Sequence, residues 1–578
     1  MQVAILFYHR SVIKHHRSVI KHNEGILRNN LDDNFEKMHH NGMRPILFAL
    51  CFLSALQLAA KERYIIYFSG KDKNAKAALG NEALARRAAN QQQTDAYDLP
   101  VAAANLQMLR NNDVRIIRTS RWLNAALVET DLGEAQLAKL SAGIQNVQNV
   151  TAKAGSVGEN KFIENNLPVI SASGKTQNKT TAVSFGLATT QNLLLGIDHL
   201  HEKGFRGKGV KVAFLDAGYN QMDSVGILDS IFANNRIKAT YDFWADTTYV
   251  FTSSDHGTSC ASLMVGNEPG VFVGTAPDVD LMFALTDDLI TETPQDEFNY
   301  VAALEWADSL GADIASVSLS YKDFDFPYAD YTYSQMDGKT TISTQGAVIA
   351  ARKGLMIVNG AGNSGFLCAP CDADSVLCVG GADSLRNYDF ISSYGPTFDG
   401  RVKPDVAAQT AFPWYKNGNS GFYIRPFYSG TSIATPQIAG LAACLKQAHP
   451  NASNIQLINA IRQSAHRYNN PDAGTGYGVP NGRVADSLLD VMLNVKETAA
   501  TINNVSIYPN PANDKVTIEA DEMIVAVEIM SLDGKLLLAE PVNAAKTNIN
   551  IQSLAPGFYL VELRGTSNVI SYSKLVKQ

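Results

Sequence analysis

Short apolar runs alternate with stretches of helical periodicity between residues 188 and 492. The runs, each long enough for one buried strand, are "GVKVAFLD", "DVDLMFALT", "ADIASVSLS", "GLMIVNGAG" and "SVLCVGG". Helices are expected at 256–266, 294–310, 341–353, 432–448 and 454–465. Continuous apolar strands that alternate with helices are typical of a parallel sheet covered on both faces. We therefore predict an α/β, doubly wound domain over 188–492, with functional side chains beyond the carboxyl ends of its strands.

Smaller units flank this domain. Residues 61–152 follow a strand–helix–strand–strand–helix–strand order, which predicts a small α+β unit with helices on one face of its sheet. Residues 153–187 are rich in Gly, Ser, Asn and Lys without any period, and we expect an exposed linker there. After a polar joint, residues 503–578 contain strand-like runs separated by turn signals, which predict a C-terminal β-sandwich.

Composition and charge exclude some classes of function. The chain has 578 residues, 46% of them hydrophobic and 18% charged, as in ordinary globular proteins of several domains. Its formal net charge is -7, and it has no basic face interleaved with aromatic residues. Both observations argue against a nucleic-acid-binding protein.

The segment 43–60 has the parts of a secretory signal peptide. Arg44 supplies the positive charge, and an apolar stretch and small residues before a cleavage site follow it. A membrane anchor is the alternative, but the apolar stretch is short for a span, so we expect no transmembrane anchor in the mature form. Residues 1–42 contain a tandem His-rich repeat that could be a metal-binding tract. We interpret them instead as an upstream extension before a true start at Met43.

Export implies an oxidising compartment, in which cysteines pair. The sequence "CAPC" at 368–371 could indicate a redox dithiol or half of a zinc site, but no second Cys pair or His cluster accompanies it. We predict one structural disulfide among Cys368, Cys371 and Cys378. Of the six cysteines, Cys51 would be lost with the signal peptide, so five remain. This odd count leaves at least one free thiol, and we expect Cys260 or Cys444 to be a small buried filler.

Three side chains of the central domain stand where catalysis could use them. Asp216 ends the strand "VKVAFLD", His256 begins a helix in "DHGTS", and Asn363 lies on the Gly-flanked loop "NGAGNSG". Each also has an ordinary explanation, as a turn former, a solvated His beside a carboxylate, and a plain turn. In a site they would supply an acid, a base and a donor to a developing oxyanion. His199 and His201 are two apart and do not share a helical face, so we expect both at the surface.

The stretch "FYSGTSIATPQIAGLAACL" at 427–445 presents several hydroxyl side chains before an apolar helix. Helix capping explains such residues, and a nucleophile at a helix N-terminus is the alternative. Pro436 distinguishes the hydroxyls, because proline clashes with the carbonyl four residues back unless it lies in the first helical turn. The helix is therefore expected to begin at about Ser432, which places that hydroxyl at the positive end of the helix dipole.

Chain order links these residues. Asp216, His256 and Ser432 follow the acid–His–Ser order of one known class of Ser-His-Asp triad. The Ser–acid–His order of α/β-hydrolases fails, because no G-x-S-x-G surrounds Ser432 and no Asp or Glu lies between Ser432 and His466.

The stretches "VAFLDAG", "DHGTS", "NGAGNSG" and "SGTSIATP" together resemble the four signature motifs of the subtilisin-like serine proteases, in the same order. The resemblance implies a subtilisin-like fold and an endopeptidase activity. It implies that Asp216 orients the imidazole of His256, which takes the proton from Ser432. Ser432 would attack the scissile carbonyl, while Asn363 and the Ser432 backbone N–H hold the oxyanion.

The resemblance also implies where substrate binds, along the strand "SVSLSY" and beside the wall of the first specificity pocket. The residues implied are Ser318, Leu319, Ser320, Gly360, Ala361 and Gly362. Ser320 and Tyr321 replace the usual Gly-rich end of this strand, and Ser259 stands where many members have a second His. Calcium is common in the family, but no loop of this sequence can be assigned to it, and no other cofactor is expected.

The flanking units fit the same resemblance. Residues 61–152 are similar to the inhibitory propeptides of this family, whose final strand occupies the active site until it is cut. Residues 503–578, with "YPNPA", "LAPGFYLVEL" and the terminal "KLVKQ", resemble the sorting domain of proteins exported by type IX secretion across a Gram-negative outer membrane. This implies passage through the periplasm and outer membrane, removal of the tail, and release or attachment at the cell surface.

We therefore predict a secreted serine endopeptidase, made as a self-inhibited precursor, that hydrolyses peptide bonds through an acyl-enzyme intermediate. Its expected partners are protein or peptide substrates, its own propeptide and the type IX secretion machinery. A non-catalytic surface-binding protein on the same scaffold is the alternative, against which the intact triad and Asn363 argue. A second alternative makes residues 503–578 a carbohydrate- or substrate-binding β-module in place of a sorting signal.

Overall fold

The computed structural model describes most of the chain from residue 61 onward. The described residues are 61–77, 79–89, 92–151, 184–288, 290–410, 414–416, 422–424, 430–494, 505–531, 536–565 and 570–577. The expected extension at 1–42, the signal peptide at 43–60 and most of the linker at 153–187 lie outside them.

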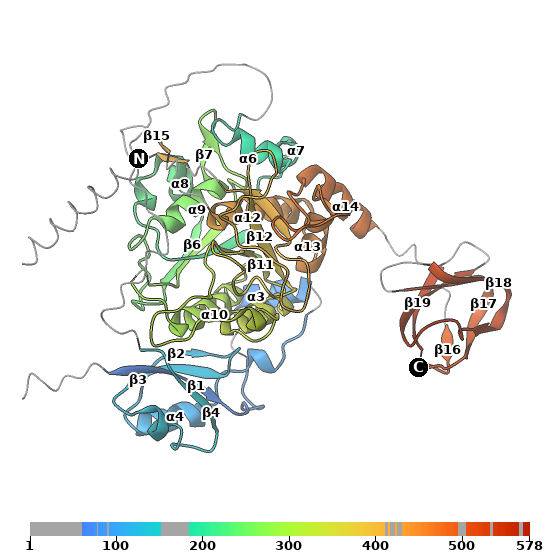
Figure 1. Ribbon diagram of the computed structural model, residues 1–578, viewed down its shortest axis with the longest axis horizontal. Coiled ribbons are helices and arrows are strands. Elements are labelled where there is room, and N and C mark those ends of the chain that lie inside the picture. The colour runs from blue at the N-terminus through green and yellow to red at the C-terminus, as the bar shows by residue number, and fades with distance from the viewer. Residues whose placement is uncertain are drawn as a thin grey trace, which may run out of the picture. The chain divides into compact units, whose positions relative to one another are not determined.

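The central domain is built on one sheet of seven strands in the order β13-β12-β11-β10-β5-β9-β6, and all adjacent pairs are parallel (Figure 1). The strands are β5 (Lys211–Asp216), β6 (Ile237–Asp242), β9 (Asp280–Leu285), β10 (Ile314–Val317), β11 (Met356–Gly360), β12 (Val376–Ala382) and β13 (Val406–Gln409). The strands expected from apolar runs are confirmed. β6 and β13 were not expected, because they are the edges of the sheet and have no long continuous apolar run.

Helices cover both faces of this sheet (Figure 1). One face packs against α9 (His256–Val265), α12 (Thr431–Ala448), α13 (Asn454–Gln463) and α14 (Gly482–Asn494), and the other against α10 (Pro294–Ser309) and α11 (Ile342–Arg352). Alternation along the strands divides their side chains between the layers: Phe214 joins the core under α9 and α12, and Leu215 joins the core under α10. The doubly wound α/β prediction is confirmed.

Short elements fill the connections of the central domain. They are α6 (Thr189–Leu194), α7 (Ile197–Glu202), α8 (Asp229–Ala233), β7 (Asn267–Glu268), β8 (Phe272–Val273), β14 (Trp414–Lys416) and β15 (Phe422–Ile424). His201 on α7 corrects the surface prediction: it is buried, and its Nε2 lies 3.0 Å from the Thr275 carbonyl oxygen. The apolar residues packed around α7 bury His201 together with Leu200.

The N-terminal unit is a four-stranded sheet in the order β2-β3-β1-β4. Its elements are β1 (Glu62–Phe68), α3 (Asn81–Ala89), α4 (Ala103–Asn111), β2 (Arg115–Ser120), β3 (Ala125–Thr130), α5 (Glu134–Leu137) and β4 (Ile144–Asn149). One face of the sheet packs against α4 and α5, as expected, through residues such as Ile66 and Leu109. On the opposite face Ile65 and Leu127 join the core that contains α10 and α11.

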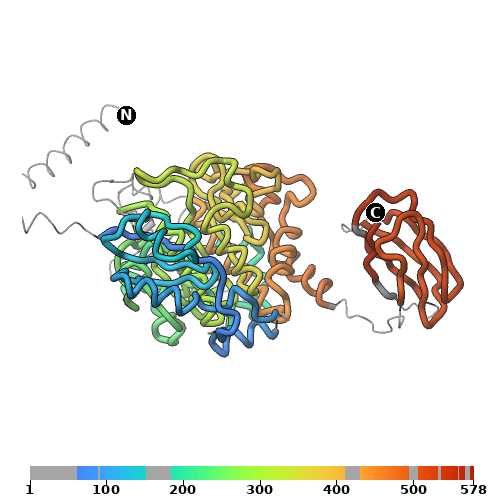
Figure 2. The backbone as a smooth tube through the Cα atoms, turned by 90° about the horizontal axis from the view of Figure 1, so that it is seen from below, coloured from blue at the N-terminus to red at the C-terminus, as the bar shows by residue number. Residues whose placement is uncertain are grey.

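The C-terminal unit is all β, coloured red in Figure 2. Its strands are β16 (Ser506–Tyr508), β17 (Lys515–Met530), β18 (Leu536–Asn550), β19 (Gly557–Gly565) and β20 (Ile570–Lys577). They form one five-stranded sheet curled round its own apolar core, where a small sandwich was expected. β17 and β18 are 16 and 15 residues long, and register shifts near their middle let a single sheet bend over that core.

The predicted disulfide is confirmed. It joins Cys371 to Cys378, while Cys260, Cys368 and Cys444 are buried unpaired thiols.

Candidate active site

Asp216 is the last residue of β5, in the interior of the parallel sheet between β9 and β10. Its side chain is buried, and Oδ1 accepts a hydrogen bond from the Ala217 N–H at 2.8 Å. The carboxylate therefore lies at the carboxyl end of a buried strand, where the sequence predicted functional side chains.

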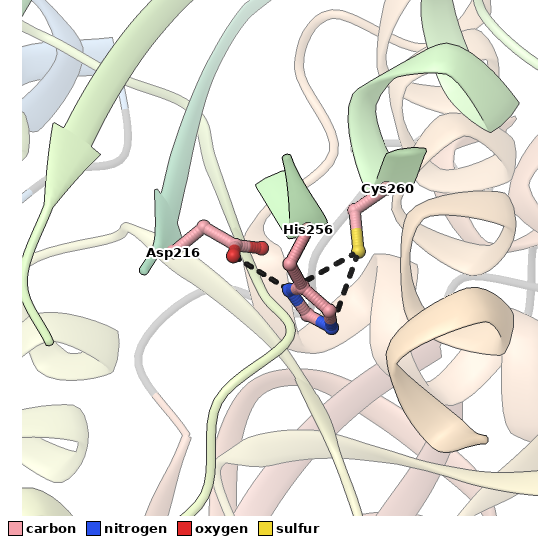
Figure 3. A group of neighbouring side chains, drawn as sticks. All are labelled: Asp216, His256 and Cys260. Carbon is pink, nitrogen blue, oxygen red and sulfur yellow. Dashed lines mark hydrogen bonds and ion pairs between the residues drawn. The ribbon is translucent and has the colours of Figure 1, made fainter. Parts of the chain in front are cut away.

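His256 is the first residue of α9, which the chain brings against the end of β5. The Gly257 N–H donates to the Gly218 carbonyl at 3.0 Å, and a Cβ at residue 257 would lie 2.5 Å from that same oxygen. Only glycine permits this approach. As a result Nδ1 of His256 lies 2.6 Å from Oδ1 of Asp216, and both side chains are 1% exposed (Figure 3).

The contact between His256 and Asp216 determines the protonation of the imidazole. A carboxylate can only accept, so Nδ1 carries the proton and Nε2 is left as the basic nitrogen of the neutral ring. Burial opposes a charge on His256, but the carboxylate of Asp216 outweighs it and raises the pKa of His256 well above its usual range.

Ser432 is the second residue of α12, because the helix begins at Thr431, one residue earlier than predicted. Pro436 lies inside the helix and has no N–H, so the carbonyl of Ser432 has no helical donor. Ser318 Oγ donates to that carbonyl at 2.9 Å instead, and the Ser432 hydroxyl donates to the Ser318 carbonyl at 3.1 Å. This reciprocal pair attaches the start of α12 to the segment that follows β10.

Cys260 lies one helical turn after His256 and was predicted only as a buried filler. Its Sγ is 3.8 Å from Nδ1 and 4.0 Å from Nε2 of His256 (Figure 3). The same thiol donates to the Ser432 carbonyl at 3.4 Å. Burial raises the pKa of this thiol, which keeps it protonated. The i, i+4 spacing from His256 is the signal in the sequence that could have placed Cys260 at the site.

The same cluster of side chains is the candidate for a metal site. In the described part of the chain, Asp216, His256 and Cys260 are the His, Cys or acidic side chains whose ligand atoms converge, within 4.8 Å of one another. Two ligands of a tetrahedral zinc lie roughly 3.3 Å apart, but Asp216 and His256 are 2.6 Å apart and share a proton. Calcium prefers oxygen ligands only, so this nitrogen- and sulfur-containing set does not fit it either.

Asn363 lies on the exposed loop after β11, beside the start of α12. Its Oδ1 accepts from the Thr431 N–H at 2.9 Å and from Thr431 Oγ1 at 3.2 Å. A Cβ at residue 430 would lie 3.0 Å from Nδ2, so the amide nitrogen stands against the turn that precedes Ser432. With the oxygen held, the N–H groups of the side chain are available to a ligand at this turn.

The residues predicted to bind substrate lie around this turn. The Leu319 and Gly360 carbonyls both accept from Nδ2 of Asn359, which ties the end of β10 to the end of β11. Gly362 has a φ of +100°, and a Cβ there would lie 2.5 Å from Sγ of Cys368. The set predicted from the sequence therefore occupies two adjacent strand ends next to Ser432; its members are Ser318, Leu319, Ser320, Gly360, Ala361 and Gly362.

Comparisons with known proteins agree with this architecture. A model of the subtilase family matches residues 207–478. Alkaline elastase YaB from Bacillus sp. (strain YaB) is 30% identical over 307 residues, which cover 52% of this chain and 71% of that protein. The chain belongs to the subtilase family. Subtilisin Savinase from Lederbergia lenta is 28% identical over 270 residues, 46% of this subtilase and 86% of that protein. Among solved structures, MycP1 from Mycobacterium smegmatis has 23% identity and a TM-score of 0.41, over 54% of this chain and 89% of that one.

The family makes this subtilase a serine endopeptidase, and its flanking units match models of their own. Residues 63–166 match the peptidase S8 propeptide domain of Bacteroidota, and residues 506–578 match the secretion system C-terminal sorting domain. The sorting domain indicates export by type IX secretion, with release or attachment at the cell surface. In the described residues, no helix combines the length and the apolar character that crossing a membrane requires.

Proposed function

We propose that this subtilase cleaves peptide bonds in protein or peptide substrates with Asp216, His256 and Ser432 as its catalytic triad. The buried 2.6 Å contact between Asp216 and His256 is the observation that carries the proposal. It lies where α9 begins, and Cys260 on the same helix contacts both the His256 ring and the Ser432 carbonyl. A base, its orienting acid and a hydroxyl at a helix N-terminus thus converge on one place.

In the acylation step, Ser432, His256 and Asp216 each have a separate role. Nε2 of His256 takes the proton of Ser432 Oγ while that oxygen bonds to the carbonyl carbon of the scissile peptide. The Ser432 hydroxyl donates to the Ser318 carbonyl at 3.1 Å, and the proposal requires it to turn about its Cα–Cβ bond toward Nε2. Asp216 stabilises the imidazolium that forms. His256 then gives the proton to the leaving amine nitrogen as the C–N bond breaks, and the acyl group stays on Ser432.

Water completes the reaction. His256 Nε2 takes a proton from a water molecule whose oxygen bonds to the acyl carbon, and the same proton returns to Ser432 Oγ as the ester bond breaks. The carboxylic acid product leaves, and no group outside the protein, its substrate and water takes part.

The oxyanion is held by two donors in this proposal. One is the amide nitrogen of Asn363, which the Thr431 N–H orients by binding the amide oxygen at 2.9 Å. The other is the Ser432 backbone N–H, which belongs to the first turn of α12, where N–H groups have no intrahelical acceptor. Preorganised donors of this kind are worth about 3–4 kcal/mol each in the transition state.

The N-terminal unit supports a role as inhibitor of its own peptidase domain. Ile65, Trp122 and Val150 pack into the core of α10 and α11, and the Tyr328 hydroxyl donates to the Thr151 carbonyl at 3.0 Å. β4 pairs with β1 as the outer strand of the propeptide sheet, and that this last strand occupies the active site stays a prediction. The residues that follow Thr151 lie outside the described residues.

The proposal gives each part of the precursor a role. Residues 61–152 inhibit, 188–492 catalyse, and 503–578 are recognised by the type IX secretion machinery and removed. We assign no calcium site to this chain.

Ser432→Ala tests the proposal most simply. The variant precursor should hydrolyse no peptide substrate above the rate of a buffer blank, while its circular dichroism matches the wild type. Peptide hydrolysis at the wild-type rate by Ser432→Ala would refute the assignment of the nucleophile.

A further inference from the structure

An arm of the propeptide lies outside its four-stranded sheet. It runs between β1 and α4 and includes α3 (Asn81–Ala89) and the short 3-10 helix Ala96–Asp98. Neither helix pairs with or extends the sheet, and α4 and α5 already cover its free face. The arm therefore serves some purpose other than building the propeptide core.

The arm docks on the peptidase domain at the amino ends of the parallel strands, and the candidate active site lies at their carboxyl ends. Asp216 and Gly360 mark the carboxyl ends of β5 and β11, where the site lies. α3 instead meets the residues that precede the strands: Glu82 pairs with Lys211 at the start of β5 and packs on Gly311 just before β10. Because the strands are parallel, these two sets of residues lie at opposite ends of the strands, and the arm does not reach the triad.

Buried charges hold this contact. The Arg86 guanidinium pairs with Asp308, at the end of α10, and donates to the Ala312 carbonyl at 2.6 Å. Arg87 donates at 2.6 Å both to Asp308 and to Asp98 of its own arm. Asp98 in turn accepts at 2.8 Å from Lys353, which follows α11.

Each side of the interface is incomplete without the other. The peptidase domain contributes Asp308 and Lys353, and the arm contributes Arg86, Arg87 and Asp98. Arg121, in the turn between β2 and β3 of the propeptide, also pairs with Asp308 at 3.2 Å. The side chains of Asp98 and Asp308 are fully buried, and those of Arg87 and Lys353 are 2% exposed. Removing one partner from such a set leaves the other buried charges with fewer opposite charges around them, which costs more than the loss of an exposed pair.

We propose that this arm is a second anchor, which keeps the propeptide bound to the peptidase domain after the chain between them has been cut. The surface around Asp308, Gly311, Ala312 and Lys353 is its docking site, and the partner that fits is the Arg-Arg helix of the chain's own propeptide. The proposal rests on the inhibitory role proposed above. Cleavage of the chain at the active site does not release the inhibitor, because its other anchor lies at the opposite ends of the strands.

The test uses the full chain after self-cleavage, isolated as the complex of propeptide and enzyme. Excess fluorophosphonate labels each enzyme molecule as its site becomes free, so the labelling rate measures release. We expect Arg86→Gln to accelerate labelling at least tenfold and Arg86→Lys to restore a rate nearer the wild type. Arg115→Gln is the matched control: Arg115 pairs with Glu129 inside the propeptide and is 57% exposed. After processing, all three variants contain the same mature enzyme as the wild type.

Several outcomes separate the claims. If the wild-type complex labels as fast as enzyme freed of propeptide, the inhibitory role itself fails. If the wild type labels slowly and Arg86→Gln labels equally slowly, the inhibitor stands and the anchor is overturned. Should Arg86→Gln not process, Lys353→Gln replaces it, because Lys353 contacts Asp95 and Asp98 of the arm from the enzyme side. Labelling of Lys353→Gln at the wild-type rate would equally overturn the anchor.

Discussion

The hydroxyl of Ser318 donates a hydrogen bond to the carbonyl of Ser432 at 2.9 Å. In a regular helix this carbonyl would accept from the N–H of residue 436, but Pro436 has none. Pro436 therefore leaves the Ser432 carbonyl free to accept a hydrogen bond from Ser318, in the segment that follows β10. This hydrogen bond joins the segment proposed to bind substrate to the start of α12, at the residue proposed as the nucleophile.

Replacing Ser318 by Ala should lower kcat/KM roughly fivefold, because one buried hydrogen bond contributes about 1 kcal/mol. Steady-state kinetics with one peptide substrate measures the effect. Ser262→Ala is the control, because Ser262 is buried on α9 and its hydroxyl donates within its own helix. An equal loss in both variants would mean that Ser318 acts only through packing.

Pro436→Ala tests the same relationship from the other side. The new N–H would compete with Ser318 for the Ser432 carbonyl, so kcat should fall several-fold. Ala is a far better helix former than Pro, so the thermal midpoint should not fall. Calorimetry and kinetics on the same sample check both expectations. A loss of stability with an unchanged kcat would contradict this account of Pro436.

Asn363→Leu should lower kcat by about 10²–10³ with little change in KM, because its amide is proposed to act on the oxyanion and not on the ground-state substrate. The nearby Gly430→Ala should give a smaller loss of the same kind. Its Cβ would lie 2.9 Å from Oδ1 of Asn363 and would displace the amide. A rise in KM alone for either variant would assign Asn363 to substrate binding instead.

The acid limb of the pH profile should report His256. The base must be neutral to accept a proton, so kcat/KM rises as pH passes upward through its pKa. Burial lowers that pKa and Asp216 raises it by more, so the midpoint should lie above 6.5, the ordinary value. Asp216→Asn should move the midpoint down and lower kcat by about four orders of magnitude. An acid midpoint below 6.5 in the wild type would contradict the coupling between Asp216 and His256.

His201 should make the peptidase domain less stable in mild acid. Burial lowers its pKa to about 4 in the folded state, so between pH 6.5 and 4 the unfolded chain binds a proton that the folded chain does not. Stability therefore rises with pH across this window, and at pH 5 the cost is about 2 kcal/mol relative to neutral pH. Thermal midpoints of His201→Gln should vary less between pH 5 and 7 than those of the wild type. Parallel curves for the two proteins would remove His201 as the cause.

The residues that the sequence placed well are those governed by local rules. Pro436 located the start of α12 to within one residue, because its steric demand is independent of the rest of the fold. Apolar runs located the interior strands, because a parallel strand covered on both faces has a continuous apolar sequence. The edge strand β6 was missed, because an edge is half solvated and its sequence, "IKATYD", is mixed.

Long-range packing determined what the sequence could not show. His201 lies between Leu200 and Glu202, and only the packing of α7 against Thr275 buries it. Asp308 and Arg87 are 221 residues apart, and nothing local pairs them. Cys260 was identified as buried, but its contact with Ser432 depends on how α9 and α12 pack.

The central claim is that Ser432 is the nucleophile of an Asp216–His256–Ser432 triad. Its most direct test is to label the mature enzyme with a fluorophosphonate and locate the adduct by mass spectrometry of its peptides. The account predicts one adduct, on Ser432, that forms far more slowly in Asp216→Asn and is absent from Ser432→Ala. An adduct on another residue, or equal labelling of Ser432→Ala, would contradict it.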